Sequence, residues 1–172
     1  LEVELTSCQS CHAAVTDVES LKNIRMMSSL TTDYDGDGNV AEGVYYEMVG
    51  LRDLVYTAVQ AYASEAGTDI CYDDSAYPYF FIDTDSSGAC NGAEAIYPNK
   101  YDAWTPRLLR GAYNFQVASK DPGAFAHNAK YIIQLLYDSA HDLNNSLMTP
   151  ADLSATRRDD PGHFEGAGRA AH

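Results

Sequence analysis

Long apolar runs are missing from this sequence of 172 residues. A membrane-spanning helix needs about eighteen or more consecutive apolar residues, and no run approaches that length, so no membrane span is predicted. Residues 1–5 lack the basic and apolar regions of a signal peptide, and we expect the numbering to begin at or after a processing point. Low-complexity tracts and repeats are also missing, and the length predicts one domain.

Basic residues are scarce. The chain has 11 Lys and Arg against 25 Asp and Glu, a formal net charge of −14. A surface this acidic argues against nucleic acid as a partner, because phosphates are bound by Lys and Arg. It favours an extracytoplasmic protein with a basic redox partner or with bound divalent cations.

Cysteine is also rare, with 4 residues, and two of them stand in the run Cys8-Gln9-Ser10-Cys11-His12. C-x-x-C-H is the attachment signature for c-type haem, in which both thiols bond to the porphyrin and the histidine ligates the iron. Zinc would need a further Cys/His pair at metal spacing, and thioredoxin-like chemistry a βαβ context. Neither is evident, which leaves a bare disulfide or metal clip as the alternative. Because haem is attached outside the cytoplasm, the motif predicts a periplasmic or extracellular location.

The other two cysteines, Cys71 and Cys90, form an even pair. In an oxidising compartment we expect them to form a disulfide. It would close a loop of about twenty residues and contribute roughly 3 kcal/mol in the chain-entropy model.

The hydrophobic pattern predicts a mainly α fold, an irregular helical single domain with long calcium-binding loops and little or no β structure. Residues 42–66 have apolar positions at helical spacing. Thr-Pro and Asp-Pro pairs open two further helices, at 105–119 and 121–144. Residues 69–98 are dense in Gly, Pro, Asn, Asp and Ser and are predicted to form a structured loop region.

Two parts of the chain are distinguished by composition. Residues 1–148 are predicted to form the haem- and calcium-binding domain. Residues 149–172 are polar and rich in Gly, Arg and Asp, and we expect them to form an extended tail that packs on the body or on a neighbouring subunit.

Residues 83–94 fit the twelve-residue EF-hand loop at nearly every position. Glycine occupies position 6, and a glutamate that can bind calcium through both oxygens stands at position 12. The expected calcium ligands are Asp83, Asp85, Ser87, the Ala89 carbonyl and Glu94. The alternative is an acidic surface turn.

An earlier acidic loop begins in the same way and then departs from the pattern, because its position 12 is Val44. The expected ligands are Asp33, Asp35, Asp37 and the Asn39 carbonyl. Glu42 and Glu47 are the carboxylates available to close the site, and we prefer Glu47. A calcium ion here would fix the start of the long helix, and the alternative is a solvated turn that caps it.

The second axial ligand of the haem iron is open at this stage. Met48 fits the apolar stripe of its helix, whereas Met26 and Met27 are close to the haem motif. His127 and His141 share a polar helix face, but about 21 Å of straight helix would separate them, so one iron cannot bind both. The remaining candidates are Met148, His163 and His172, and the tail histidines are within reach of a haem in this subunit or in a neighbouring one.

Five segments of the chain, taken together, resemble bacterial extracytoplasmic polyhaem c-type cytochromes, over most of residues 8–165. The segments are 8–12, 33–38 with Glu42, Gly43 and Glu47, 76–83, 104–109, and Asp121-Pro122-Gly123-Ala124-Phe125-Ala126-His127-Asn128. In such proteins a His-Asn pair in the equivalent helix supplies the distal histidine, so the resemblance implies that His127 is the distal ligand. The run Gly162-His163-Phe164 also resembles the tail of the family.

One departure from the family is the single C-x-x-C-H motif, where relatives carry many. A single haem cannot form a long intramolecular path for electrons. The leading hypothesis is therefore an electron carrier with no catalytic residues, one covalent haem c and two calcium ions, whose partner is a redox protein or another cytochrome subunit.

Two rival hypotheses remain. In the first, the chain is a subunit of an extracellular filament, a homo-oligomer in which stacked subunits conduct electrons, as the tail, the 13 tyrosines and the low haem count indicate. In the second, it is a haem peroxidase-like enzyme with an open distal position, where His127 or His141 acts as acid and base.

Overall fold

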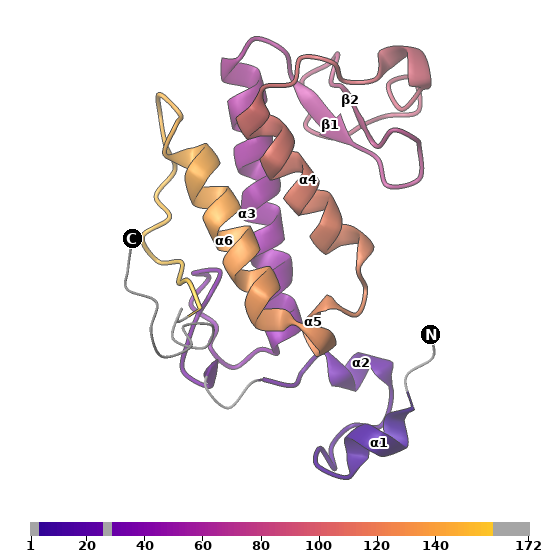
Figure 1. The fold of residues 1–172 in the computed structure, drawn as a ribbon, viewed down its shortest axis with the longest axis vertical. Coiled ribbons are helices and arrows are strands. Elements are labelled where there is room, and N and C mark those ends of the chain that lie inside the picture. The colour runs from indigo at the N-terminus through magenta and orange to yellow at the C-terminus, as the bar shows by residue number, and fades with distance from the viewer. Residues whose placement is uncertain (1–3, 26–28, 160–172) are drawn as a thin grey trace.

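Three long helices form the body of the protein in the computed structural model, which describes residues 4–25 and 29–159. They are α3 (Val44–Glu65), α4 (Pro106–Lys120) and α6 (Ala129–Asn144), and each packs against the other two (Figure 1). The shorter elements are α1 (Leu5–Gln9), α2 (Val18–Leu21), β1 (Ile70–Tyr72), β2 (Phe80–Ile82), the 3-10 helix η2 (Tyr97–Asn99) and α5 (Ala124–His127). The mainly α prediction is confirmed. None of the described helices is both long and apolar enough to cross a membrane.

The core lies where the three long helices meet. Leu51 and Val55 of α3, Leu108 of α4, and Ile133 and Leu136 of α6 are all fully buried. Burial of each such side chain contributes roughly 1.5–3 kcal/mol, so this contact holds the body together.

Two of the predicted helices agree closely with the structure. The first is α3, and just after its end Gly67 has a φ of +96°, a conformation that glycine adopts without strain. The second is α4, in which Pro106 takes the first position and the Thr105 hydroxyl accepts a hydrogen bond from Leu108 N at 3.2 Å.

The third predicted helix is wrong in one respect. Residues 121–144 were expected to form one helix, but the structure has α5 and α6, separated by Asn128 with φ −156° and ψ 47°. Asparagine leaves the helical conformation readily because its side chain competes for backbone hydrogen bonds. The straight helix assumed between His127 and His141 is therefore absent.

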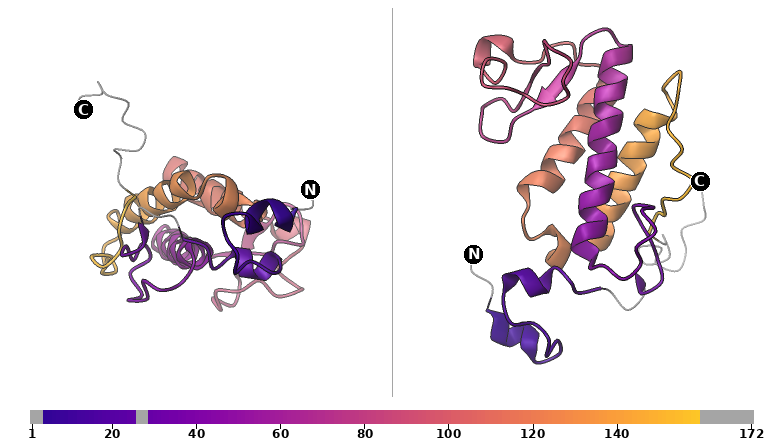
Figure 2. Two further views of the ribbon diagram at one scale, coloured as in Figure 1. Left: turned by 90° about the horizontal axis from the view of Figure 1, so that it is seen from below. Right: turned by 180° about the vertical axis from the view of Figure 1, so that it is seen from behind.

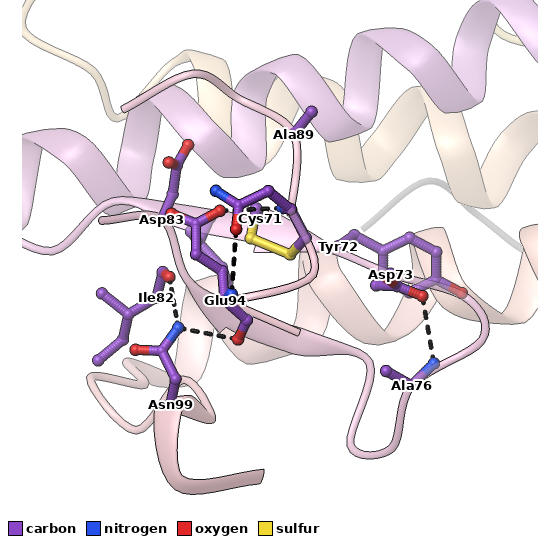
Figure 3. Close-up of a disulfide and its surroundings, with 12 residues drawn as sticks. Cys71, Tyr72, Asp73, Ala76, Ile82, Asp83, Ala89, Glu94 and Asn99 are labelled. Carbon is purple, nitrogen blue, oxygen red and sulfur yellow. Dashed lines mark hydrogen bonds between the residues drawn. A yellow bond between two sulfur atoms is a disulfide. The ribbon is translucent and has the colours of Figure 1, made fainter. Parts of the chain in front are cut away.

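The segment 69–98, expected to be loop, contains a two-stranded antiparallel sheet in which Cys71 pairs with Phe81. A disulfide joins Cys71 to Cys90, with 5.2 Å between their Cα atoms, which confirms the predicted pairing (Figure 3). Asn99 Nδ2 donates hydrogen bonds to the carbonyls of Ile82, at 2.8 Å, and Glu94, at 3.0 Å. These contacts close the second acidic loop against the sheet.

Residues 151–159, which we call the strap, lie along α6. Arg158 donates two hydrogen bonds of 2.8 Å to Asp138, and the Thr156 hydroxyl lies 2.9 Å from His141 Nε2. Arg157 N donates to the Tyr34 carbonyl at 3.0 Å, so the strap also holds the first acidic loop. The rest of the predicted tail, residues 160–172, lies outside the described residues.

Candidate haem and calcium sites

The C-x-x-C-H run forms a single helical turn at one end of the molecule (Figure 1). The N–H groups of Cys11 and His12 both donate to the Cys8 carbonyl, at 3.2 and 2.9 Å. Cys8 is half-buried, Cys11 is exposed, and their sulfurs are not bonded to each other. Residues three positions apart on such a turn are neighbours, so both thiols are available to one planar group.

His12 borders an open groove of about 600 Å³. Its lining is His12, Ala13, Ala14, Val15, Ser20, Asn23, Ile24, Arg25, Leu30, Val40 and Ala41. Two large apolar side chains at this groove, Leu30 and Val40, are 58% and 43% exposed. Apolar walls with a few polar groups, in a volume of several hundred Å³, are typical of cofactor sites. The thiols, the imidazole and the groove together fit a covalently attached haem.

His127 is exposed at the end of α5, and its ring lies against Gly123, where an added Cβ would be 3.0 Å from His127 Cδ2. Tyr45 connects this helix to the haem end of the chain. Its ring centre lies 5.4 Å from that of Phe125 in α5 and 4.6 Å from Lys22 Nζ at the end of α2. The two further views also show α5, in orange, beside the indigo α2 (Figure 2). His127 is therefore at the haem end, although it is not among the described residues that line the groove.

The other candidate axial ligands are placed elsewhere or lie outside the described residues. Met48 is buried in the core, and Met148 is 84% exposed beyond the end of α6. His141 stacks on Tyr137 with 4.0 Å between ring centres, and burial lowers its pKa. The remaining four are outside the described residues: Met26, Met27, His163 and His172.

The second acidic loop, which lies between β2 and η2, brings its acidic side chains together. Single carboxylate oxygens of Asp83, Asp85 and Glu94 lie within 4.8 Å of one another. Asp83 and Glu94 are both buried, and Figure 3 shows them beside the disulfide. Gly88, at position 6, has a φ of +81°, the left-handed conformation that the sharp turn of such a loop requires. Ser87 Oγ donates to the Ala89 carbonyl at 3.0 Å, so the predicted ligands at positions 5 and 7 are adjacent.

Backbone N–H groups orient the glutamate of this loop. Glu94 Oε1 accepts hydrogen bonds from Thr84 N at 2.7 Å and Asp85 N at 3.3 Å, and Oε2 accepts from Asn91 N at 3.0 Å. The hydrogen bonds from Asn91 N and from Thr84 lower the pKa of Glu94, so it is ionised at neutral pH.

The first acidic loop is closed in the same way by a residue of α3. Oxygens of Asp33, Asp35 and Glu47 lie within 4.8 Å of one another, and so do those of Asp35, Asp37 and Glu42. Glu47 is fully buried, and its Oε2 accepts hydrogen bonds from Tyr34 N at 2.7 Å and Asp35 N at 3.2 Å.

Glu42 and Asn39 lie at the edge of this loop and are joined by a hydrogen bond. Asn39 is exposed and donates through Nδ2 to Glu42 Oε2 at 3.2 Å. Gly38, at position 6, has a φ of +91°, as Gly88 does in the second loop. The geometry brings all the predicted carboxylates of the first loop together, with Glu47 at its buried end.

Negative charge accumulates in the first loop. Burial, with added repulsion from Asp37 and Glu47, raises the pKa of Asp35 to about 7. The pKa of Glu42 is raised for the same reasons. A cation among these carboxylates would reverse both shifts, because an opposite charge within a few ångströms favours the ionised form.

Arg25 is the functional residue that the sequence did not indicate. Its Nη1 lies 2.6 Å from Glu47 Oε1, and its side chain is 7% exposed. A single arginine between the haem motif and the acidic loop belongs to no spacing pattern, so its role appears only when the loop is folded against α3.

Comparison with known proteins shows similarity to c-type cytochromes. Two curated relatives from Geobacter sulfurreducens are the C-type polyheme cytochromes OmcB, 31% identical over 112 residues, and OmcC, 29% identical over 107 residues. The matches cover 56% and 55% of this chain but only 15% and 14% of the relatives. No protein-family model and no solved structure matches. The similarity supports a c-type cytochrome with covalent haem c, as the motifs predicted.

Proposed function

We propose that this chain is an extracytoplasmic electron carrier with one covalently attached haem c. The observation that carries the proposal is the Cys8–His12 turn, which has two unbonded thiols and whose His12 borders an open groove of about 600 Å³. Cys8 and Cys11 would bond to the haem, and His12 would hold the iron from one side. When bound, the haem supplies one-electron exchange at its iron.

His127 is the distal ligand in this proposal. Support comes from the Tyr45 contacts with Phe125 and Lys22, which hold α5 at the same end of the body as the haem turn. The His127 side chain is exposed at the end of α5, a helix of four residues that ends at Asn128. An exposed imidazole is accessible to a haem bound beside this helix. With two histidine ligands the iron has no open position, and simple electron exchange is expected without substrate turnover.

Two calcium ions brace the acidic loops in the same proposal. Both loops place a buried glutamate beside two aspartates, and both have a left-handed glycine at position 6. In the first loop Glu47 Oε1 is buried 2.6 Å from Arg25 Nη1, and oxygens of Asp33, Asp35 and Glu47 lie within 4.8 Å of one another. One arginine does not balance three carboxylates, and a cation would neutralise the remaining negative charge.

The proposed partner is a redox protein or another cytochrome subunit, and the proposed location is the periplasm or the cell exterior. The Cys71–Cys90 disulfide supports that location, since disulfides persist in oxidising compartments. The net charge of −14 favours a basic partner surface.

A filament subunit is the second candidate function. Tyr77, between β1 and β2, and Tyr97 of η2 stack with 6.2 Å between ring centres while being 71% and 58% exposed. The two strands lie at the end of the body away from α1 (Figure 1). Exposed aromatic side chains are enriched at protein interfaces. Particle size by light scattering, with and without a calcium chelator, separates the two functions, and a strict monomer in both conditions would exclude the filament.

Visible spectra of the purified protein, oxidised and reduced with calcium present, test the electron carrier. We expect a sharp reduced α-band and a low-spin ferric spectrum that is unchanged by cyanide. His127→Ala should become high-spin, whereas the control His141→Ala should stay low-spin. If His127→Ala stays low-spin, the distal ligand is Met26, Met27 or a tail histidine, and if no α-band appears the haem proposal fails.

A further inference from the structure

Arg25 lies where the haem groove meets the first acidic loop. It is one of the residues that line the groove beside His12. Its guanidinium is nevertheless turned into the loop, where Nη1 donates to the Glu42 carbonyl at 2.6 Å and Nε donates to the Ser29 carbonyl at 3.0 Å. Nη2 donates to the Thr32 carbonyl. One side chain therefore holds both ends of the acidic loop.

The acidic loop is also a wall of the groove. Val40 and Ala41, which follow Asp33, Asp35 and Asp37 along the same loop, line the groove. The aspartates are not among the described residues that line the groove, and oxygens of Asp33 and Asp35 gather with Glu47 instead. A calcium ion and a haem would thus share this loop as a neighbour.

The calcium ion and Arg25 compete for one carboxylate. Glu47 is fully buried, and its Oε1 lies 2.6 Å from Arg25 Nη1. A bidentate glutamate gives both oxygens to calcium, as the last ligand of an EF-hand loop does. When calcium binds, the negative charge of Glu47 is shared with the ion, and the positive charge of Arg25, a residue that lines the groove, is less neutralised.

We propose that calcium in the first acidic loop and the redox state of the haem are coupled, with Arg25 as the positioning residue that transmits the coupling. The inference rests on the proposed function, because it requires both the haem and the calcium ion. Added positive charge beside the groove favours the ferrous state, which carries one positive charge fewer than the ferric state. Calcium therefore raises the reduction potential, and by linkage the reduced protein binds calcium more tightly.

The expected size of the calcium-dependent shift in reduction potential follows from the exposure of the groove to solvent. The groove is open to solvent, and salt screens charges beyond about 8 Å at physiological ionic strength, so the coupling falls at the low end of its usual range. We expect calcium to bind about fivefold more tightly to the reduced protein. For a one-electron couple a tenfold ratio equals 59 mV, and fivefold equals about 40 mV.

Redox titration of the haem-loaded protein, followed in the visible spectrum with calcium or with chelator, tests the coupling. The variants are Asp37→Asn, which weakens the first loop, and the matched control Asp85→Asn, which weakens the second loop at the other end of α3 (Figure 1). Both residues are exposed, so neither change opens the core. Calcium should raise the reduction potential of wild type and of Asp85→Asn, and this shift should vanish in Asp37→Asn.

Calorimetry separates failure of this inference from failure of the proposed function. Two bound calcium ions with no shift in wild type would overturn the coupling and leave the cytochrome proposal intact. A shift lost in Asp85→Asn but kept in Asp37→Asn would overturn it as well. Absence of calcium binding would refute the proposed calcium sites and the coupling with them, and absence of the α-band would refute the proposed electron carrier itself.

Variants of Arg25 test whether this residue transmits the effect of calcium to the haem. Arg25→Lys keeps the charge and should retain most of the calcium-dependent shift, whereas Arg25→Gln removes the charge and should lose at least half of it. Equal shifts in the two variants would refute Arg25 as the transmitting residue. If Arg25→Gln does not fold, because Glu47 is left buried without its counter-ion, Arg25→Lys still decides, since a lost shift there contradicts a role based on charge.

Discussion

Glu47 occupies in the first acidic loop the place that Glu94 occupies in the second. Each accepts hydrogen bonds from the two N–H groups that follow the first aspartate, at 2.7 and 3.2 Å for Glu47 and at 2.7 and 3.3 Å for Glu94. Their positions in the sequence differ, because Glu94 is the twelfth residue of its loop and Glu47 the fifteenth. The first turn of α3 makes up the difference by carrying Glu47 back over the loop.

This equivalence predicts which carboxylate closes the first calcium site. Glu47→Gln should weaken calcium binding to the first loop by about tenfold or more, because a charged bidentate ligand is lost. Glu42→Gln should weaken it less, since Glu42 lies at the edge of the loop and bonds Asn39. Calorimetric titration with Asp85→Asn as background isolates the first loop, and a larger loss in Glu42→Gln would show that Glu42 closes the site.

A glycine of α3 provides room for the same loop. A Cβ at Gly50 would collide with Asp35 Oδ2 and lie 2.6 Å from Asp35 Cγ. Gly50→Ala should therefore weaken calcium binding to the first loop, although alanine favours an isolated helix by about 1 kcal/mol over glycine. Gly92→Ala is the control, because an added Cβ there meets nothing within 4 Å. Unchanged calcium affinity in Gly50→Ala would mean that Asp35 moves aside without cost.

Removal of the disulfide should destabilise the fold but weaken calcium binding at the second loop alone. Replacing both Cys71 and Cys90 with serine is expected to lower the free energy of unfolding by about 3 kcal/mol, measured by urea unfolding with calcium present. Calcium affinity should fall at the second loop, which contains Cys90, and not at the first. Equal losses at the two loops would indicate a general loosening of the fold instead.

The lowered pKa of His141 predicts that the stability of the fold depends on pH. Burial lowers its pKa below the ordinary 6.5, against an opposing effect of Asp138. The unfolded chain then binds a proton more readily than the folded protein, so stability should fall as the pH drops below about 6.5 toward the lower folded pKa. His141→Gln should flatten the profile of thermal unfolding in this window, relative to wild type in saturating calcium. A variant that keeps the wild-type slope would assign the dependence to other groups.

The haem turn, the two acidic loops, α3 and α4 were predictable from the sequence, because each depends on local spacing. The disulfide pairing was predictable because only Cys71 and Cys90 remain once the haem motif is set aside. Thiols three positions apart share a turn, glycine at position 6 admits the left-handed bend, and Thr-Pro opens a helix. Such features need no knowledge of what the segment packs against. The identity of the axial and calcium ligands stays a prediction until it is measured.

Only the tertiary structure decided how these local units meet. The contact of Tyr45 with α5 and the strap across Tyr34 depend on packing between residues far apart in the sequence. Arg25 is the clearest case, since burial beside Glu47 gives it a partner that no spacing rule connects to it. Local spacing determined which chemical groups this chain carries, and long-range burial determined which of them act on one another.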